Sequence, residues 1–317
     1  MKPALLIFKL CKQEDSFVPT KIKLNPMQQI SLIFIMLLIS IVANAETIRM
    51  AVTDLVGLEE LQREFGAFRQ ELSTITGYDI EFMPVTNRNA AAEALRFKKV
   101  DLILTGPAEY VVMQKRSPGK LVAGFSRPDY FAIVITLADQ PYTTAADLKG
   151  QKIGLGSVGS TSKHLGPVQA LADAGLNPQK DVEIVHTKVP ILWESLKRGD
   201  LAGIGINHLK FLALRDKEAA REGGLPPGAF RVVARGPDLP NDVLMAGAHV
   251  DDKVVAAFRK ALVENSDRLV SAILTGDDNQ KFRGMRFITG LKDSQYNYIR
   301  KMYATAGYPE YSDFIGN

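Results

Sequence analysis

The 317-residue sequence contains a single cysteine, Cys11, which precedes a short apolar run near the N-terminus. Because no thiol follows that run, the rest of the chain forms no disulfide. It also offers no thiolate as a metal ligand and no cysteine for lipid attachment at a new N-terminus. The shortage of cysteine therefore excludes a disulfide scaffold, a cysteine-based metal site and a lipoprotein.

Long hydrophobic runs are also lacking. The longest apolar stretch, residues 30–42, has about 13 residues, whereas a helix that spans a bilayer needs about 20. Lys21 and Lys23 precede this stretch and Ala43-Asn44-Ala45 follows it, which is the pattern of a secretory signal with its cleavage site. We therefore expect residues 1–45 to be a cleaved signal segment and the remainder to work in the periplasm.

An excess of charge of one sign is absent once this segment is set aside. Residues 1–45 hold five of the 39 basic residues and two of the 35 acidic residues, so 34 and 33 remain and the formal net charge falls from +4 to +1. No Lys/Arg-rich run occurs in the remainder. Since a nucleic-acid partner needs a concentrated basic surface, we expect no nucleic acid to bind.

Signatures of catalysis and of metal binding are missing as well. No Gly-x-Ser-x-Gly turn occurs, and nothing in the sequence pairs a serine nucleophile with a histidine base. His164, His186 and His208 follow expected strands, but no His-x-x-x-His pair or acidic cluster accompanies them. We expect a binding protein without catalytic residues, metal or cofactor, and keep a periplasmic hydrolase as a minor alternative.

What the chain does contain is a regular alternation of strand and helix patterns after the signal segment. This order predicts an α/β fold with parallel-rich sheets flanked by helices. The chain is expected to cross between two lobes at residues 131–137 and 232–246. Lobe 1 then comprises residues 46–135 and a return through residues 235–317 with the C-terminal helices, and lobe 2 comprises residues 136–234.

Hydrophobic periodicity places the individual elements. The expected strands are residues 47–52, 80–84, 101–104, 131–137, 153–155, 182–185, 202–206, 230–234 and 243–246. The expected helices are residues 58–76, 90–98 with Asn89 as cap, one that starts at residues 105–107, one that ends at 174, 191–198, 251–274 and 293–306.

One segment combines a strand, a glycine-rich turn, hydroxyl side chains and a helix start. Gly154, Gly156 and Gly159 form a G-x-G-x-x-G pattern that Ser160-Thr161-Ser162 follows. The pattern nearly matches a dinucleotide fingerprint and a nucleotide phosphate loop, but their ligands are not normally available outside the cytoplasm. Helix N–H groups with adjacent hydroxyls suit a small anion, and the alternative is that Ser160 or Thr161 merely caps the helix.

Polar side chains gather where the expected strands end. Ligands of parallel sheets bind beyond the carboxyl ends of the strands, and hydroxyl, amide and imidazole groups there can donate hydrogen bonds to an oxyanion. Loops after strands are polar in any case, which is the alternative interpretation. The candidate ligand-binding residues at these ends are Thr105, Gly106, Ser157, Ser160, Thr161, Ser162, His164, His186, Thr187, Asn207 and His208.

Several motifs resemble those of the periplasmic substrate-binding proteins of phosphonate, phosphite and phosphate ABC transporters. The resemblance covers nearly all of the chain after the signal segment. The motifs are Asp101-Leu102 before Pro107-Ala108-Glu109-Tyr110, Pro128-Asp129-Tyr130, residues 147–153, Ser160-Thr161-Ser162 and Leu239-Pro240-Asn241. The resemblance implies a type II-like, two-lobed binding protein with a two-strand hinge. It also implies that Ser160 and Thr161 hold a small oxyanion, and that Tyr110 and Tyr130 line the lobe 1 side.

We expect a monomer, and the same resemblance implies that it delivers phosphite, a phosphonate or phosphate to an ABC permease. Two departures matter: Lys163 replaces a frequent glycine, and Asn207-His208 stand where phosphonate binders tend to carry aspartates, which argues against an aminoalkylphosphonate. Some members of this broad family sense ligands, including arsenic oxyanions, for a membrane histidine kinase, and this is the alternative role. A cysteine-based arsenite site is excluded.

Overall fold

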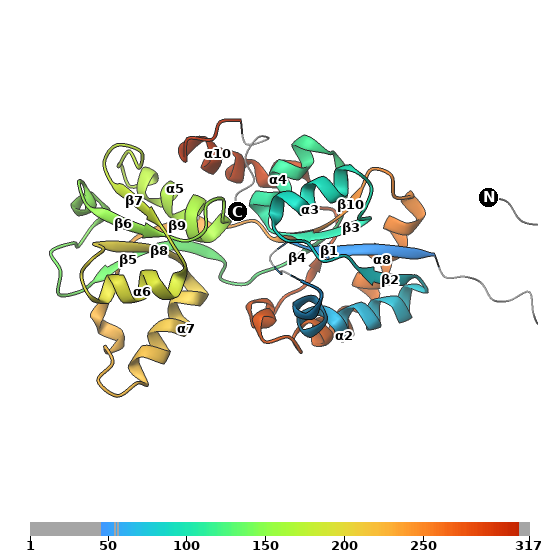
Figure 1. The fold of residues 1–317 in the computed structure, drawn as a ribbon, viewed down its shortest axis with the longest axis horizontal. Coiled ribbons are helices and arrows are strands. Elements are labelled where there is room, and N and C mark those ends of the chain that lie inside the picture. The colour runs from blue at the N-terminus through green and yellow to red at the C-terminus, as the bar shows by residue number, and fades with distance from the viewer. Residues whose placement is uncertain (1–45, 54, 56, 311–317) are drawn as a thin grey trace, which may run out of the picture. The chain divides into compact units, whose positions relative to one another are not determined.

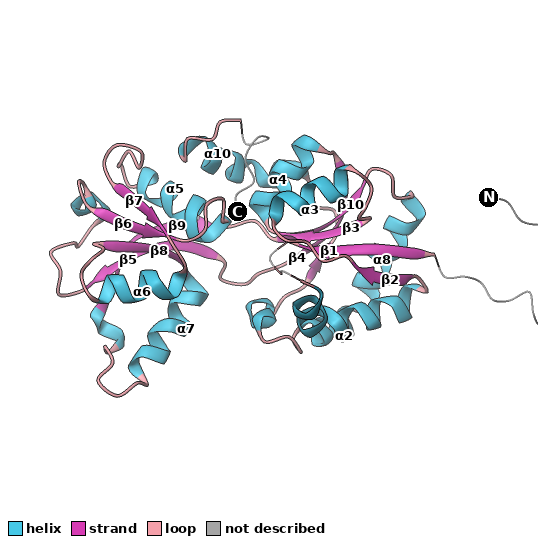
Figure 2. Ribbon diagram, in the orientation of Figure 1, coloured by secondary structure: helices cyan, strands magenta, loops and turns pink. Residues whose placement is uncertain are grey.

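The computed structural model describes residues 46–53, 55 and 57–310, which belong to one compact unit. The expected signal segment, residues 1–45, lies outside the described residues. The described part is built from two β-sheets, and helices cover both (Figure 1, Figure 2). None of the helices in this part has the length and apolar character needed to cross a bilayer.

The first sheet contains strands from both ends of the chain. Its strands are β1 (Thr47–Val52), β2 (Asp79–Phe82), β3 (Leu102–Thr105), β4 (Gly119–Phe125), β10 (Asp242–Gly247) and β11 (Phe287–Ile288). Their order across the sheet is β11-β4-β10-β3-β1-β2. β1 is parallel to β2 and β3, whereas β10 is antiparallel to β3 and β4, and β11 is antiparallel to β4. We call this sheet with its helices lobe 1.

The second sheet contains strands from the middle of the chain. Its strands are β5 (Phe131–Leu137), β6 (Lys152–Leu155), β7 (Glu183–His186), β8 (Gly203–Asn207) and β9 (Phe230–Asp238), in the order β7-β6-β8-β5-β9. β6 is parallel to β7 and β8, whereas β5 is antiparallel to β8 and β9. This sheet with its helices is lobe 2. Both sheets are therefore mixed, because the strands at the crossings reverse the chain direction.

The chain passes between the lobes twice, after β4 and after β9. Leu239 N–H donates to the Tyr130 carbonyl at 2.7 Å, and Arg127 N–H donates to the Asn241 side-chain oxygen at 3.3 Å. The two crossings are thus hydrogen-bonded to each other. The two-stranded connection expected from the sequence is present.

Helices fill the connections between the strands. They are α2 (Leu58–Thr76), α3 (Arg88–Arg96), α4 (Pro107–Arg116), α5 (Gly166–Asp173), α6 (Val189–Lys197), α7 (His208–Ala219), α8 (Asp252–Glu264), α9 (Ser266–Ile273) and α10 (Asn297–Thr305). Shorter turns are η1 (Ala145–Leu148), η2 (Thr161–Leu165), η3 (Pro227–Ala229), η4 (Asp278–Phe282) and η5 (Asp293–Tyr296).

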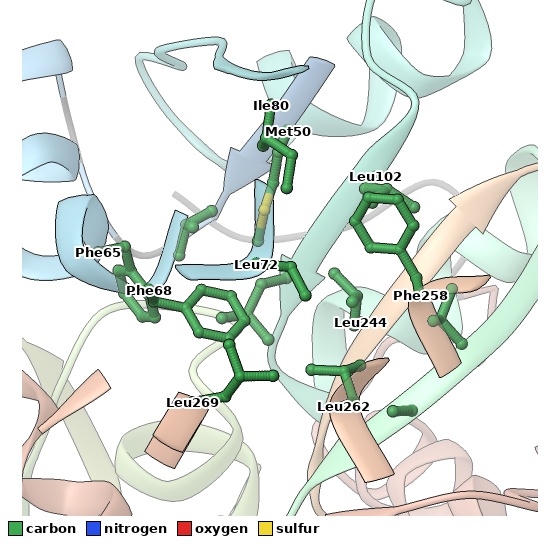
Figure 3. Close-up of a cluster of buried hydrophobic side chains, with 14 of the residues drawn as sticks. Met50, Phe65, Phe68, Leu72, Ile80, Leu102, Leu244, Phe258, Leu262 and Leu269 are labelled. Atoms are coloured by element: carbon green, nitrogen blue, oxygen red, sulfur yellow. The ribbon is translucent and has the colours of Figure 1, made fainter. Parts of the chain in front are cut away.

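Alternate residues of the first sheet belong to two different apolar clusters. Met50, Leu102 and Leu244 pack with Phe68 of α2 and Phe258 of α8 (Figure 3). The residues between them in β1, β3 and β10 pack with α3, α4 and α10 instead. This alternation follows from the two-residue period of a strand. The carboxyl ends of β1 and β3 lie next to each other, and α4 starts directly after β3.

The second sheet is covered in the same way. Ile133, Ile135 and Ile204 pack with α6 and α7, while Val134 and Ile153 pack with α5. Side chains on both faces of these strands are buried, which explains why the strands read as continuous apolar runs.

The structure corrects some of the expected elements. Asn87, not Asn89, caps α3: its backbone is extended, and its side-chain oxygen accepts from Ala90 N–H at 2.9 Å. The expected helix 251–274 is divided at Asn265, where φ −121° and ψ 31° interrupt the helical geometry. Strand β4 and helix α7 were not predicted.

Candidate functional site

Strand β3 ends at Thr105, whose hydroxyl oxygen lies 3.1 Å from that of Thr53 at the end of β1. Gly106 follows as the N-cap of α4, and Pro107 occupies the first turn, where its missing N–H is tolerated. A Cβ atom on Gly106 would stand 2.7 Å from a Glu109 carboxylate oxygen. The start of α4 is therefore a tightly packed group of polar atoms at the ends of two strands.

A small cavity lies at the same strand ends. Thr53, Thr105, Gly106, Asp242 and Phe282 contribute to its lining, and its volume is about 10 Å³. That volume is at the lower limit for one water molecule. A phosphate-sized anion would fit there only if the surrounding groups moved apart.

The glycine-rich turn after β6 leads into the π-helical turn η2 and then into α5. Gly159 has φ +81°, a left-handed conformation that favours glycine. The Ser160 carbonyl accepts from the N–H groups of His164 and Leu165 at 3.1 and 3.0 Å. The Ser160 side chain makes no capping hydrogen bond, so it does not cap the helix as the alternative interpretation supposed.

The Thr161 hydroxyl contacts lobe 1. Its oxygen accepts a hydrogen bond from Ala108 N–H, in the first turn of α4, at 3.1 Å, and both residues are buried. N–H groups of a first helical turn have no partner in their own helix. Thr161 of lobe 2 therefore supplies an acceptor to a helix start of lobe 1. An anionic oxygen placed at this point would meet the same donor.

Two ion pairs between largely buried side chains lie beside this contact. Arg88 Nε is 2.5 Å from Glu109 Oε1, and these side chains are 13% and 3% exposed. An Arg127 guanidinium nitrogen is 3.5 Å from Asp242 Oδ1, and these side chains are 10% and 9% exposed. Charges at such depth need partners, since an unpaired buried charge is strongly destabilising. An anion entering this region would compete with the two carboxylates for the arginines.

Tyr130 connects Arg127 to the hydroxyl cluster. The guanidinium carbon of Arg127 lies 3.6 Å from the centre of the Tyr130 ring. Burial raises the pKa of the Tyr130 phenol to about 12, although the Arg127 charge and a hydrogen bond with the Ser162 side chain act in the opposite direction. The phenol is therefore protonated at neutral pH. Ser162 of lobe 2 and Tyr130 at the crossing are brought together.

His164 and His186 lie next to each other beyond β6 and β7, with ring centroids 4.7 Å apart. His164 is buried, and its Nδ1 accepts from Gly159 N–H at 2.9 Å. Burial, together with the nearby His186, lowers the pKa of His164 to about 3. The ring is neutral at pH 7 with its proton on Nε2, which leaves Nε2–H as a donor. His186 is exposed, and its Nδ1 is 2.7 Å from the Gly156 carbonyl oxygen.

The Tyr110 hydroxyl is bonded to the C-terminal segment. It donates to Asp293 at 3.0 Å, and its ring packs on Tyr296 with the centroids 4.5 Å apart. Burial raises the pKa of both phenols. The Asp293 carboxylate also pairs with Arg300 at 2.7 Å. Tyr110 therefore connects α4 to the segment before α10. Its hydroxyl hydrogen is donated to Asp293 and is not available to a ligand in this structure.

Asn207 and His208 begin α7 at the end of β8. The Asn207 side-chain oxygen accepts from Lys210 N–H at 2.8 Å and so caps the helix. The His208 ring stacks on Phe131, with the centroids 4.5 Å apart and the planes 16° apart. Asn207 therefore serves as a cap, and His208 lies beside the start of β5.

Ser157 and Thr187 are held through their backbones. Ser157 is exposed, and its carbonyl accepts from Ser160 N–H at 3.0 Å. Thr187 N–H donates to the Leu155 carbonyl at 3.1 Å. The Thr161 hydroxyl thus contacts lobe 1, whereas the hydrogen bonds of Ser157 and Thr187 lie within lobe 2.

The charged side chains beside the Thr161 contact were not among the candidates from the sequence. They are Arg88, Glu109, Arg127 and Asp242. Arg88 follows the expected strand 80–84 within a few residues, and the strand-end rule extended to cations would have included it. Arg127 follows β4, which was not predicted, so the rule could not have found it. Glu109 and Asp242 carry no such signal, because only the fold brings them to those arginines.

This arrangement places several hydrogen-bond donors near one another, beside two arginine–carboxylate pairs. It combines hydroxyls, a helix N–H, neutral Tyr and His donors and two arginines, and such donors form strong hydrogen bonds with oxyanions. Across residues 46–310, apart from 54 and 56, no three His, Cys, Asp or Glu side chains are placed to hold a metal ion.

Comparison with known families gives a match over most of the chain. The model of the periplasmic substrate-binding proteins of phosphonate ABC transporters matches residues 57–285. The match begins just before α2, runs through lobe 2 and ends after η4. It therefore includes the Thr161 contact and both ion pairs.

Individual relatives are more distant. A Prochlorococcus marinus protein named "Probable ABC transporter phosphite binding protein PhnD1" is 25% identical over 203 residues, which are 62% of this chain and 63% of that protein. The tetrathionate sensor histidine kinase TtrS of Salmonella typhimurium is 30% identical over 106 residues, 31% of this chain and 18% of the kinase. The chain thus spans less than two thirds of either relative.

The fold is shared with a solved structure of PhnD1 from Prochlorococcus marinus in complex with methylphosphonate. The TM-score is 0.60 at 17% sequence identity, over 84% of this chain and 100% of that one. This likeness confirms the two-lobed binding-protein fold expected from the sequence.

Proposed function

Because the chain belongs to the family of periplasmic substrate-binding proteins of phosphonate ABC transporters, we propose that it captures a small oxyanion between its lobes for an ABC permease. The oxyanion is phosphite, a phosphonate or phosphate. The family consists of binding proteins and not of enzymes, so the hydrolase alternative is set aside. The observation that carries the proposal is the hydrogen bond from Ala108 N–H to Thr161, because it joins a hydroxyl of lobe 2 to a helix start of lobe 1.

The anion would replace that direct contact. Ser160, Thr161 and Ser162 offer hydroxyls from lobe 2, and the first turn of α4 offers N–H groups from lobe 1. Arg88 pairs with Glu109, the residue after Ala108. Arg127 lies against Tyr130, which is hydrogen-bonded to Ser162, so both arginines could add charge. A buried anion needs such partners, since desolvation without them costs several kcal/mol.

The lobes must separate for this to happen. Thr161 is in direct contact with α4, and the cavity of about 10 Å³ at the strand ends is too small for the ligand. A ligand would enter an open form and stabilise a closed one, which is a shift between two states. This supports a protein that encloses its ligand rather than one that binds it on an open surface.

A ligand screen tests the proposal. The purified protein would be melted with phosphate, phosphite, methylphosphonate, arsenate, arsenite, sulfate or tetrathionate. A ligand at a thousandfold excess over its Kd stabilises by about 4 kcal/mol, so a true ligand should raise the melting temperature clearly. No shift with any phosphorus oxyanion would contradict the proposal.

The alternative role is to sense an oxyanion for a membrane histidine kinase, and the similarity to TtrS favours including it. A transport component should lower uptake of its ligand when deleted. A sensor should change the output of a kinase and leave uptake unchanged. Affinity capture of the tagged protein from membranes, followed by identification of a permease or a kinase, distinguishes the two.

A further inference from the structure

Helix α10 contacts both lobes. It packs on α4 of lobe 1 and on α5 and η2 of lobe 2 (Figure 1). Since the chain itself crosses between the lobes twice, α10 makes a third, non-covalent connection. It lies beside the Thr161 contact, because both α4 and η2 contribute to that contact.

The side of α10 toward α4 is apolar and buried. Ile299, Met302 and Tyr303 are completely buried and belong to the same cluster as Tyr110, whose members come mostly from lobe 1 and include Leu165 of lobe 2. The Tyr303 hydroxyl donates to the Ala108 carbonyl at 3.3 Å. Separating this side would expose several large side chains, each of which contributes about 1.5–3 kcal/mol when buried. Helix α10 is therefore anchored on lobe 1.

The contacts of α10 with α5 include an ion pair and hydrogen bonds. Lys301 Nζ lies 3.1 Å from Asp173, and the Tyr298 hydroxyl donates to the same carboxylate at 3.4 Å. The Thr305 hydroxyl donates to the Gln169 side-chain oxygen at 2.6 Å. The Lys301 and Asp173 side chains are 58% and 42% exposed. Water can replace the partners of the exposed Lys301 and Asp173 at low cost, so this ion pair can open reversibly, whereas Gln169 is buried.

We propose that α10 is a strap that holds the lobes together, and that Asp173 sets the ligand affinity through the fraction of closed protein. The inference rests on the proposed function, because it concerns closure of the same site. When the lobes separate, the polar contacts with α5 break while the apolar anchor on α4 persists. A contact present only in the closed form raises the apparent affinity by raising the population of that form.

The first test removes the strap contact. Asp173→Ala should weaken binding of phosphite, methylphosphonate or phosphate by about two- to tenfold in titration calorimetry, as expected for an exposed ion pair and a hydrogen bond. The matched control is Glu183→Gln, which breaks the exposed Lys152–Glu183 pair between β6 and β7 within lobe 2. It should leave affinity unchanged. Equal affinities for Asp173→Ala and the wild type would overturn the proposal.

The second test locks the strap. Asp173→Cys and Lys301→Cys provide two thiols for a short bifunctional reagent, because the one native cysteine, Cys11, lies in the expected signal segment. Cross-linked protein should exchange bound methylphosphonate or phosphite at least about tenfold more slowly than the same protein alkylated by a monofunctional reagent, because opening requires these residues to separate. Equal exchange rates would show that α5 and α10 stay together during opening and would refute the strap.

A third measurement needs no ligand. Small-angle X-ray scattering should give a larger radius of gyration for ligand-free Asp173→Ala than for the wild type or Glu183→Gln. If none of the three anions binds the wild type, the proposed function fails. The scattering measurement then tests by itself whether α10 holds the lobes together. Identical radii for all three proteins would then refute it.

Discussion

Among single residues, Ser160 and Thr161 are neighbours in the chain with different environments. The Ser160 carbonyl closes the π-helical turn and its side chain makes no capping bond. The Thr161 side chain instead accepts from the first turn of a helix in the other lobe. Because that bond exists only between lobes in contact, we expect the Thr161 hydroxyl to serve both closure and ligand binding.

The double variant Ser160→Ala/Thr161→Ala tests these hydroxyls. Charge-assisted hydrogen bonds contribute roughly 1.5–3 kcal/mol each, so losing two should raise the Kd of the ligand found in the screen by about two to four decades. Titration calorimetry well below the melting temperature measures this. Thr74→Ala is the control, because Thr74 is exposed on α2 and its hydroxyl donates only within that helix, to the Gln70 carbonyl. An unchanged Kd in the double variant would place the site elsewhere.

His164 should make the folded state sensitive to acid. Its pKa is lowered to about 3 by burial and by His186, while an unfolded histidine titrates near 6.5. Between these values the unfolded chain binds a proton that the folded protein does not. The free energy of unfolding therefore falls as pH decreases through this window, by up to about 1.4 kcal/mol per pH unit.

His164→Gln should remove most of this slope. Urea unfolding at several pH values between 4 and 7 gives the comparison with the wild type. The exposed His186 is the matched control, and His186→Gln should keep the slope. Parallel pH profiles for the wild type and His164→Gln would show that folding does not lower the pKa of His164.

Among the elements, helix α3 begins at a cap formed by one side chain, that of Asn87. Asn87 accepts from Ala90 N–H, and Arg88 directly after it pairs with Glu109 of α4. The cap therefore positions a cation of the candidate site as well as the helix. The same reasoning applies to Gly106 and Pro107, which begin α4 directly after β3.

Asn87→Ala should lower the free energy of unfolding by about 1 kcal/mol, because a first-turn N–H loses its acceptor. Asn89→Ala, two residues further on, should change it by less than about 0.5 kcal/mol, since Asn89 is not the cap. Denaturant titration of both variants measures the difference. A larger loss for Asn89→Ala would contradict the cap seen in the structure.

For the whole molecule, the expected removal of the signal segment can be tested most directly. The Ala43-Asn44-Ala45 pattern predicts cleavage after Ala45, so that the working protein begins at Glu46. N-terminal sequencing of protein isolated from the periplasm should therefore start at Glu46. Sedimentation of the same material should give the mass of a monomer. Material that retains residues 1–45 would contradict the expected processing.

Local patterns were enough to predict much of the fold. Strand 47–52 and helix 58–76 are present with the expected bounds, because apolar periodicity and a terminal glycine act within the element itself. The motifs also pointed to the binding-protein family. Strand β4 escaped prediction because it begins at Gly119-Lys120, and α7 escaped because it buries few of its side chains.

Only the tertiary structure decided how the candidate residues meet. The Thr161 hydroxyl and Ala108 N–H are 53 positions apart in the chain, and Tyr110 and Asp293 are 183 apart. Such contacts depend on how two sheets and α10 pack, and no local pattern encodes the partner of a given polar group. The sequence by itself determined which segments carry hydroxyls, helix starts and signal features. Packing decided which arginines and carboxylates surround them, because burial requires each charge to be paired with whatever group the fold brings near.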